Sequence, residues 1–134
     1  MSDCIYCKIM AGEIPAYCIY EDDLFKVILD LYPSAVGHAL IIPKEHAANL
    51  YELGEKQAQA LMPLAKKIAI ALKELLNCDG MNILQNNGEV SGQTINHYHM
   101  HLIPRYKDDG ISIEWVQQSP TAEDFKKILD NIKL

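Results

Sequence analysis

Three of the five histidines in this chain stand at alternate positions of one short stretch, and this alternation constrains the fold more than any other feature. They are His97, His99 and His101, in the segment INHYHMHLIPRY at positions 95–106. Successive side chains of an extended strand point to opposite faces, so the three imidazoles share one face at steps of about 6.5–7 Å. The alternating positions are apolar: Tyr98, Met100 and Leu102. We therefore expect a core strand that buries its apolar face and presents imidazoles to a surface or cleft.

Hydrophobic spacing in the remainder predicts one domain, residues 1–134, of the α+β class. Apolar residues at 58–76 follow the three-four spacing of an amphipathic helix, in which Pro63 should cause a kink or mark an early turn. Gly80 is expected to end this helix. Strand-like segments lie at 16–21, 24–32, 37–43, 81–87 and 97–105, and shorter helical segments lie at 4–12 and 121–134. This order predicts an antiparallel sheet with the long helix on one face.

Composition and charge exclude several classes of partner. The 134 residues carry a net charge of -6, so a broad electrostatic contact with nucleic acid is not expected. No apolar run reaches the ~20 residues of a membrane helix, so we expect no membrane partner. The first ten residues lack the basic and apolar regions of a signal peptide. We expect a cytoplasmic protein whose four cysteines are reduced.

The loop before the histidine row, NNGEVSGQT at 86–94, has the composition of an anion-binding site. Its glycines, including Gly92, free backbone N–H groups, and Asn86, Gln93 and Thr94 add side-chain donors. The histidines themselves permit two functions. Neutral imidazoles bind metals, and one imidazole can act as a nucleophile whose neighbours hold its tautomer and charge. A phosphate-binding loop that leads directly into the row favours the nucleophilic function.

The segment HYHMHLI resembles the His-φ-His-φ-His-φ-φ motif, with φ apolar, that names the histidine-triad (HIT) superfamily. Further segments resemble the family in the same order: EIPAYCIYEDD, LDLYPSAVGHALIIPKEH and NGEVSGQTINHYHMHLIPR. The resemblance implies a five-stranded antiparallel sheet with one long helix, to which we add the short N-terminal and C-terminal helices. It implies a homodimer whose two sheets join. It also implies an enzyme that cleaves a nucleoside monophosphate from a leaving group at the α-phosphate.

The same resemblance implies a role for each matching residue. His99 would be the nucleophile that forms a covalent nucleotidyl-histidine, His101 would stabilise charge near the phosphate, and His38 would support the row. Thr94 would deliver a proton to the leaving group, and Asp30 would bind both ribose hydroxyls. Other contacts would come from Asn86 and Gln93 for the phosphate and leaving group, and from Tyr6, Ile9, Ile28 and Leu31 for the base. On spacing alone, His38 and Asp30 are polar residues near strand ends, and the four apolar residues are simply core.

Two cysteines near the N-terminus and two histidines outside the proposed chemistry form an acceptable tetrahedral zinc set: Cys4, Cys7, His46 and His97. Some histidine-triad proteins and the related galactose-1-phosphate uridylyltransferases look similar here. The resemblance implies a structural zinc that fixes the N-terminal helix to the catalytic strand. The alternative is a pair of reduced thiols in a short helix, with His46 on the surface. A redox role is not favoured, because a thioredoxin-like parallel context is absent.

Two branches of the superfamily remain open on these segments. EIPAYCIYEDD resembles the Hint branch, which hydrolyses purine nucleoside phosphoramidates and aminoacyl adenylates. The GQT triplet and the pair Pro104–Arg105 resemble the Fhit branch, which cleaves dinucleoside polyphosphates. We expect a Hint-like hydrolase that binds a purine nucleotide and releases AMP or GMP. The alternatives are a Fhit-like enzyme and a nucleotide-binding regulatory protein with incidental turnover.

Overall fold

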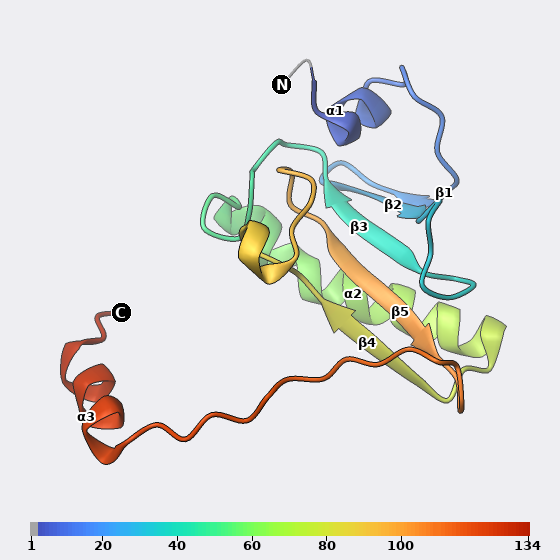
Figure 1. Ribbon diagram of the computed structural model, residues 1–134. Coiled ribbons are helices and arrows are strands. Elements are labelled where there is room, and N and C mark those ends of the chain that lie inside the picture. Colours follow the sequence, from blue (N-terminus) through green and yellow to red (C-terminus); the bar gives the residue numbers. More distant parts are fainter. Residues whose placement is uncertain (1–2) are drawn as a thin grey trace.

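A five-stranded antiparallel sheet with a helix on each face forms the body of the protein (Figure 1). The computed structural model describes residues 3–134. The strands are β1 (Cys18–Glu21), β2 (Phe25–Leu29), β3 (Ala39–Pro43), β4 (Gly80–Leu84) and β5 (Met100–Arg105), and the helices are α1 (Ile5–Met10), α2 (Glu55–Leu76) and α3 (Ala122–Asn131). The strand order is β1-β2-β3-β5-β4, and every neighbouring pair is antiparallel. The expected fold class and the expected number of strands are confirmed.

Strand β3 lies at the centre of the sheet and is buried along its whole length, because helices cover both faces. Its residues alternate between two cores. Ala39 and Ile41 pack in the core against α2, and Leu40 and Ile42 pack in the core beneath α1. The apolar side chains of the histidine segment all lie in the core against α2: Tyr98, Met100 and Leu102. The expected burial of that face is therefore confirmed, and the imidazoles are left facing α1.

Helix α2 begins at Glu55 and contains Pro63 in its first half. It ends at Leu76, where Asn77 takes a left-handed conformation with φ of 50°. The expectation that Gly80 ends this helix was wrong. Asparagine tolerates the left-handed region almost as readily as glycine does, so the helix ends three residues before Gly80, which instead begins β4.

Strand β5 begins at Met100, so the expectation of a strand from position 97 was wrong by three residues. In the register of β3 and β5, Met100 pairs with Ile41, which places Tyr98 opposite Pro43. Proline has no N–H to donate, so the ladder of hydrogen bonds stops there. The Tyr98 N–H instead donates to the carbonyl of Ala47 at 2.7 Å. This bond holds the histidine segment against the loop that follows β3.

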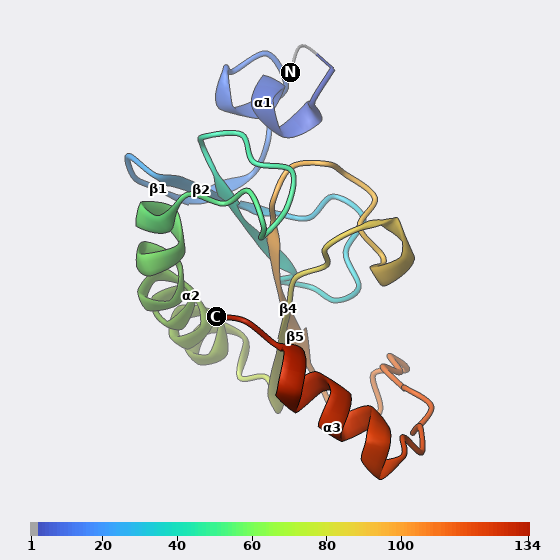
Figure 2. The same ribbon diagram turned by 90° about the vertical axis from the view of Figure 1, so that its left-hand side faces the viewer.

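The last part of the chain, residues 112–134, leaves the body as an extended arm that ends in α3 (Figure 1), and α3 lies toward the viewer in Figure 2. Helix α3 begins with a capping box. The Thr121 hydroxyl accepts from the Asp124 N–H, and the Asp124 carboxylate accepts from the Thr121 N–H. Every residue from Glu114 to Leu134 is exposed. Among residues 3–134, no helix combines the length and apolar character needed to cross a bilayer.

Candidate active site and metal-binding cluster

Helix α1 covers the histidine row, so the imidazoles are buried beneath it. The Tyr6 ring stands edge-on to the rings of His97 and His99, with centroid separations of 5.7 and 5.2 Å. His97 is 0% exposed and His99 is 8% exposed. The His101 ring lies 5.0 Å from that of His99. Hydrophobic spacing predicted α1 and the row separately, and only the family resemblance, through the expected zinc ligands, placed this helix against the catalytic strand.

One hydrogen bond determines which nitrogen of His99 is free to react. Its Nδ1 lies 2.7 Å from the main-chain oxygen of His97, and only a protonated nitrogen donates to a carbonyl. In the neutral ring, Nε2 therefore carries the lone pair. Burial lowers the pKa of His99, although the bond to His97 and the charge of Asp30 oppose this shift. A neutral imidazole with a free Nε2 is the form that a nucleophilic histidine requires.

A chain of hydrogen bonds fixes the neighbouring His101 in the complementary tautomer. The Ser34 N–H donates to Nδ1 of His38 at 3.0 Å, so His38 carries its proton on Nε2. That Nε2 lies 2.9 Å from Nδ1 of His101 and donates to it. Neutral His101 then holds its own proton on Nε2. Burial, together with the nearby rings of His99 and His38, lowers the pKa of His101 to about 4, against the opposing charge of Asp30.

An apolar cavity of about 150 Å³ lies between α1 and strands β2 and β3. It is lined by all five residues that the sequence assigned to the nucleoside: Tyr6, Ile9, Ile28, Asp30 and Leu31. Asp30 accepts from the Tyr32 N–H at 2.9 Å through Oδ1, and its Oδ2 lies 3.6 Å from Nε2 of His38. The cavity therefore carries a carboxylate at the end that faces the His38–His101 pair.

Sequence reasoning missed several residues of this cavity, including Ile14, Tyr32 and Leu40. Leu40 pairs with Ile28 across β2 and β3, so combining the two expected strands in register would have identified it. Ile14 lies in the segment between α1 and β1, for which the sequence pattern gave no position relative to the sheet.

The loop at 86–94 combines two glycines of positive φ with one buried amide side chain. Gly88 and Gly92 have φ values of 93° and 105°, in the region that favours glycine. The Gln93 side chain accepts from the Gly88 N–H at 2.9 Å and donates to the carbonyls of Ala48 and Ile95 at 2.6 and 3.0 Å. Both the oxygen and the nitrogen of this amide are therefore hydrogen-bonded within the protein, and Gln93 stabilises the conformation of the loop.

The other two side chains assigned to the phosphate lie nearer the surface. A Cβ on Gly92 would approach Nδ2 of Asn86 to 3.2 Å, so the Asn86 amide lies directly against the loop backbone. Thr94 is exposed and lines a separate depression together with Cys4, Ile5 and His46. Ile5 also lines the apolar cavity, so the two depressions meet at α1.

Cys4, Cys7, His46 and His97 form a second cluster on the other side of His99. All four potential ligand atoms lie within 4.8 Å of one another. Nδ1 of His97 lies 3.3 Å from Sγ of Cys4 and 3.1 Å from Nδ1 of His46, and Sγ of Cys7 lies 3.3 Å from Nδ1 of His46. Tetrahedral zinc, with bonds of about 2.0–2.3 Å, separates its ligand atoms by roughly 3.3–3.8 Å. The cluster therefore fits a four-coordinate zinc ion.

Two further hydrogen bonds favour metal binding by this cluster. Nε2 of His97 donates to the Pro43 carbonyl at 2.8 Å, which leaves the lone pair on Nδ1, the atom that faces the sulfurs. The Cys7 N–H lies 3.4 Å from Sγ of Cys4 and stabilises negative charge there. His46 is only partly exposed and contacts the cluster, so it is not an isolated surface residue.

Comparison with known proteins supports the fold and the assignment of the histidine motif. The HIT domain family model matches residues 11–108. The adenosine 5'-monophosphoramidase of Schizosaccharomyces pombe is 37% identical over 130 residues, which cover 96% of this chain and 95% of that protein. This chain belongs to the HIT family.

Solved structures match beyond the HIT domain itself. A Bacillus subtilis member of the HIT family has a TM-score of 0.89 at 40% identity, covering 96% of this chain and 93% of its own. That coverage takes in most of the arm. A Zn-bound histidine triad family protein from Mycobacterium smegmatis has a TM-score of 0.78 at 36% identity, covering 96% of this chain and 91% of its own.

Proposed function

We propose that this protein is a nucleotide hydrolase that releases AMP or GMP from a leaving group at the α-phosphate. The observation that carries the proposal is the pairing of two neutral rings, in which His99 presents a free Nε2 and His101 presents an Nε2–H. One ring can attack phosphorus while the other donates to a phosphate oxygen. The name of the Schizosaccharomyces pombe relative supports a purine nucleoside phosphoramidate as substrate.

The reaction proceeds in two displacements. In the first, Nε2 of His99 forms a bond to the α-phosphorus and the bond from phosphorus to the leaving nitrogen or oxygen breaks. The Thr94 hydroxyl relays a proton from solvent to the leaving group, while His101 stabilises charge on the phosphate. In the second, a water oxygen bonds to phosphorus, the bond to His99 breaks, and the water proton passes to solvent. The imidazole returns to its starting state.

Binding of the nucleotide divides between the cavity and the loop. The base enters the apolar cavity against Tyr6, and Asp30 accepts hydrogen bonds from the ribose hydroxyls. Backbone N–H groups around Gly92 and the Asn86 amide hold the phosphate. In this arrangement Gln93 acts through the loop that it braces.

We further propose that Cys4, Cys7, His46 and His97 bind one structural zinc ion. The spacing of the ligand atoms and the Zn-bound relative support this assignment. Four protein ligands would leave no open coordination position, so the metal would stabilise the fold around the site. Through the carbonyl of His97, the same cluster positions His99.

A substrate panel tests this proposal. Adenosine 5'-phosphoramidate, an aminoacyl adenylate and a diadenosine polyphosphate are each offered to the wild type, to His99→Ala and to Tyr98→Phe. The Tyr98 control changes the same segment on its opposite face. We expect turnover of the first two substrates, loss of at least about 10³-fold in His99→Ala, and near-normal turnover in Tyr98→Phe.

Each outcome of the panel has a distinct meaning. Intact-mass spectrometry of the rapidly quenched wild type should detect the nucleotidyl adduct, and the adduct should be absent from His99→Ala. Preference for the diadenosine polyphosphate would establish the Fhit-like alternative. Nucleotide binding without turnover would establish a regulatory protein, and normal turnover in His99→Ala would exclude the mechanism.

A further inference from the structure

One residue that lines the apolar cavity, Tyr32, is almost entirely exposed to solvent. It is 92% exposed, and the preceding Leu31 is 62% exposed. The lining residues from α1 and β3 are covered instead, since Tyr6, Ile9 and Leu40 are 3–6% exposed. Leu31 and Tyr32 therefore mark an open side of the cavity, which we call its mouth. A tyrosine can bury about 150–250 Å² of surface, and Tyr32 leaves nearly all of its own uncovered.

The backbone that carries Tyr32 is held on both sides. The Tyr32 N–H donates to Oδ1 of Asp30 at 2.9 Å, and Pro33 restricts Tyr32 to extended conformations. Two residues further on, the Ser34 N–H donates to Nδ1 of His38 at 3.0 Å. The ring can therefore change position by rotation of its own side chain between staggered rotamers, while the loop stays in place. Such rotation of an exposed side chain is fast.

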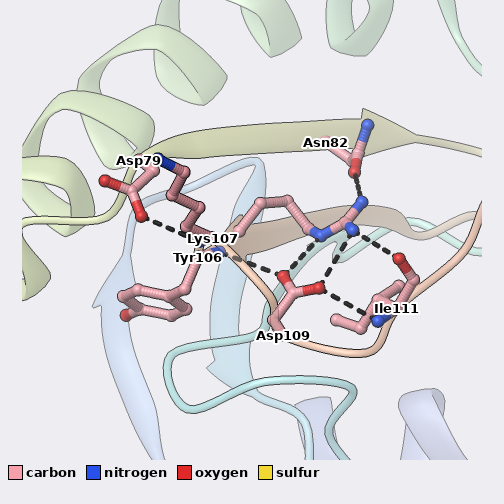
Figure 3. A network of polar contacts seen from close by, with 7 residues as sticks. Asp79, Asn82, Tyr106, Lys107, Asp109 and Ile111 are labelled. Carbon is pink, nitrogen blue, oxygen red and sulfur yellow. Dashed lines mark hydrogen bonds and ion pairs between the residues drawn. The ribbon is translucent and has the colours of Figure 1, made fainter.

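A second aspartate in the protein makes a similar bond to a tyrosine N–H, and there its carboxylate is fully used (Figure 3). Asp109 accepts from the Tyr106 N–H at 3.0 Å and from the Ile111 N–H at 2.9 Å. It also accepts two hydrogen bonds from the Arg105 guanidinium, at 2.8 and 3.1 Å. A carboxylate offers about four acceptor positions, so Asp109 has none left for a ligand. Its role is to fix the turn after β5.

The Asp30 carboxylate keeps most of its acceptor capacity. Among residues 3–134 it accepts one hydrogen bond, from the Tyr32 N–H, and its Oδ2 lies 3.6 Å from Nε2 of His38. A carboxylate with acceptor positions to spare thus lies two residues from an exposed aromatic ring, at the mouth of an apolar cavity. This combination suits a ligand that joins hydroxyl groups to a flat ring, which describes a nucleoside.

We propose that Tyr32 rotates over the mouth and stacks on the base when a nucleotide binds, and that this stack favours purines over pyrimidines. The inference rests on the proposed function, in which the base lies in this cavity against Tyr6. The sheet and α1 cover the inner side of the bound base, and Tyr32 covers the side that faces solvent. Every base has a face on which an aromatic ring can stack, and the two fused rings of a purine offer more area than a pyrimidine does.

Nuclear Overhauser effects test the stack on the unmodified full-length protein with AMP. We expect cross-peaks between the adenine C–H protons and the ring protons of Tyr32, assigned by their loss in Tyr32→Phe of the hydroxyl-adjacent pattern. Cross-peaks from adenine to Tyr6 with none to Tyr32 would overturn the stack and leave the proposed function standing. Wild-type protein that binds no AMP at millimolar concentration would overturn both.

Four proteins then measure what the ring contributes. In calorimetry, Tyr32→Ala should raise the dissociation constant of AMP by about tenfold and that of CMP by less than about threefold. Tyr32→Phe keeps the stack and should stay within about twofold of wild type. Tyr51→Ala is the matched control, because Tyr51 is 83% exposed and does not line the cavity. It should also stay within about twofold.

Steady-state kinetics separate a stack from a general structural role. The loss of a contact made equally in the ground state and the transition state raises KM and leaves kcat unchanged. With adenosine 5'-phosphoramidate, Tyr32→Ala should therefore raise KM by about tenfold with kcat within about twofold of wild type. Unchanged AMP affinity in Tyr32→Ala, equal losses for AMP and CMP, or an effect confined to kcat would each refute the assignment of Tyr32.

Discussion

Two clusters flank His99, and they use the same side chain for opposite purposes. On one side His46 and His97 meet two cysteine sulfurs, and on the other His38 and His101 meet the Asp30 carboxylate. The difference lies in the second ring nitrogen. His97 donates its N–H to the Pro43 carbonyl and so turns a lone pair toward the sulfurs, where a metal can bind. His38 accepts an N–H from Ser34 and so turns a proton toward His101.

This comparison shows that a backbone group can determine the role of a histidine. A carbonyl partner leaves a lone pair on the other nitrogen, as a metal ligand or a nucleophile requires, and an N–H partner leaves a proton there. Both partners come from main chain near the ends of β3, which the sequence pattern does not distinguish. The following predictions test the contrast, from the largest expected effect to the smallest.

The largest effect is expected on zinc content, from a substitution in the cluster that contains the two cysteines. Wild-type protein should contain about one zinc per chain, and Cys7→Ser should contain close to none, because a closed zinc site requires all four ligands. The melting temperature should fall with the metal. Metal analysis by mass spectrometry checks the content, and Cys18→Ser, at an exposed cysteine outside the cluster, is the control. Zinc-free wild type that takes up none on titration would exclude the site.

A substitution in the cluster that contains the Asp30 carboxylate should lower turnover and leave the metal bound. His38→Ala removes the donor that sets the tautomer of His101, so turnover of adenosine 5'-phosphoramidate should fall by about 10²-fold. Zinc content should stay at the wild-type level. Steady-state kinetics and metal analysis on the same preparation separate the two clusters. A variant that loses zinc as well as activity would show that they are one structural unit.

Acid should distinguish the two clusters through stability. The pKa of His101 is lowered to about 4 by burial, so the unfolded chain takes up a proton below about pH 6.5 while the folded chain does not until about pH 4. Unfolded protein binds more protons in this window, so the free energy of unfolding falls as pH falls from about 6.5 to 4. A shift of this size corresponds to about 3.4 kcal/mol at most, and solvent screening at this partly exposed ring reduces the loss attributable to His101 to on the order of 2 kcal/mol.

Denaturant titrations of the wild type and His101→Asn at several pH values check this prediction. Acid also releases a metal held by thiolates and imidazoles, so the difference between the two proteins isolates His101. A parallel pH dependence in both proteins would contradict the assignment.

A smaller effect should come from the loop that we propose holds the phosphate. Gly92 has a φ of 105°, and a Cβ there would press against Asn86 at 3.2 Å. Gly92→Val should therefore weaken AMP binding by about tenfold, measured by calorimetry. Gly110→Val serves as the control, because its φ of 76° is also positive but the space around it is open. Equal loss in both variants would mean that backbone strain alone, away from the phosphate, explains the effect.

The smallest effect should come from salt. The loop and the histidine row, residues 86–101, contain no lysine or arginine. Short hydrogen bonds in a buried site are screened less than surface ion pairs, so AMP affinity should change less than about twofold between 50 and 200 mM salt. Arg105→Ala should also change it little, because that guanidinium is bound to Asp109 and Asn82. A steep loss with salt would point to a cationic phosphate site elsewhere.

Much of the fold followed from hydrophobic period alone. Alternation around His99 predicted which face of the segment is buried, and the three-four spacing at 58–76 predicted α2. Both predictions depend only on the repeat of side-chain directions along a single strand or helix. The end of α2 at Asn77 and the start of β5 at Met100 were misplaced, because a single residue or a partner strand decides each boundary.

The site was predictable by residue type and not by arrangement. Family resemblance named five residues of the cavity and all members of both clusters, and the structure brings them together in three adjacent groups. The tautomers of His99 and His101 depend on main-chain groups of other segments, and the inward turn of Gln93 depends on a carbonyl 45 positions away. Such contacts exist only after folding, so no local pattern records them.

Helix α1 has a consequence for how metal and nucleotide influence each other. This short helix and its N-cap residue Cys4 place two thiols, those of Cys4 and Cys7, beside His46 and His97. The same helix places Tyr6 and Ile9 on the wall of the apolar cavity. Ordering so short a helix is costly without support, and either ligand would supply that support. Each ligand would then bind more tightly when the other is present, and thermodynamic reciprocity makes the two enhancements equal. With both proposed ligands, a shortage of zinc would lower the affinity for nucleotide without altering a residue proposed to contact phosphate.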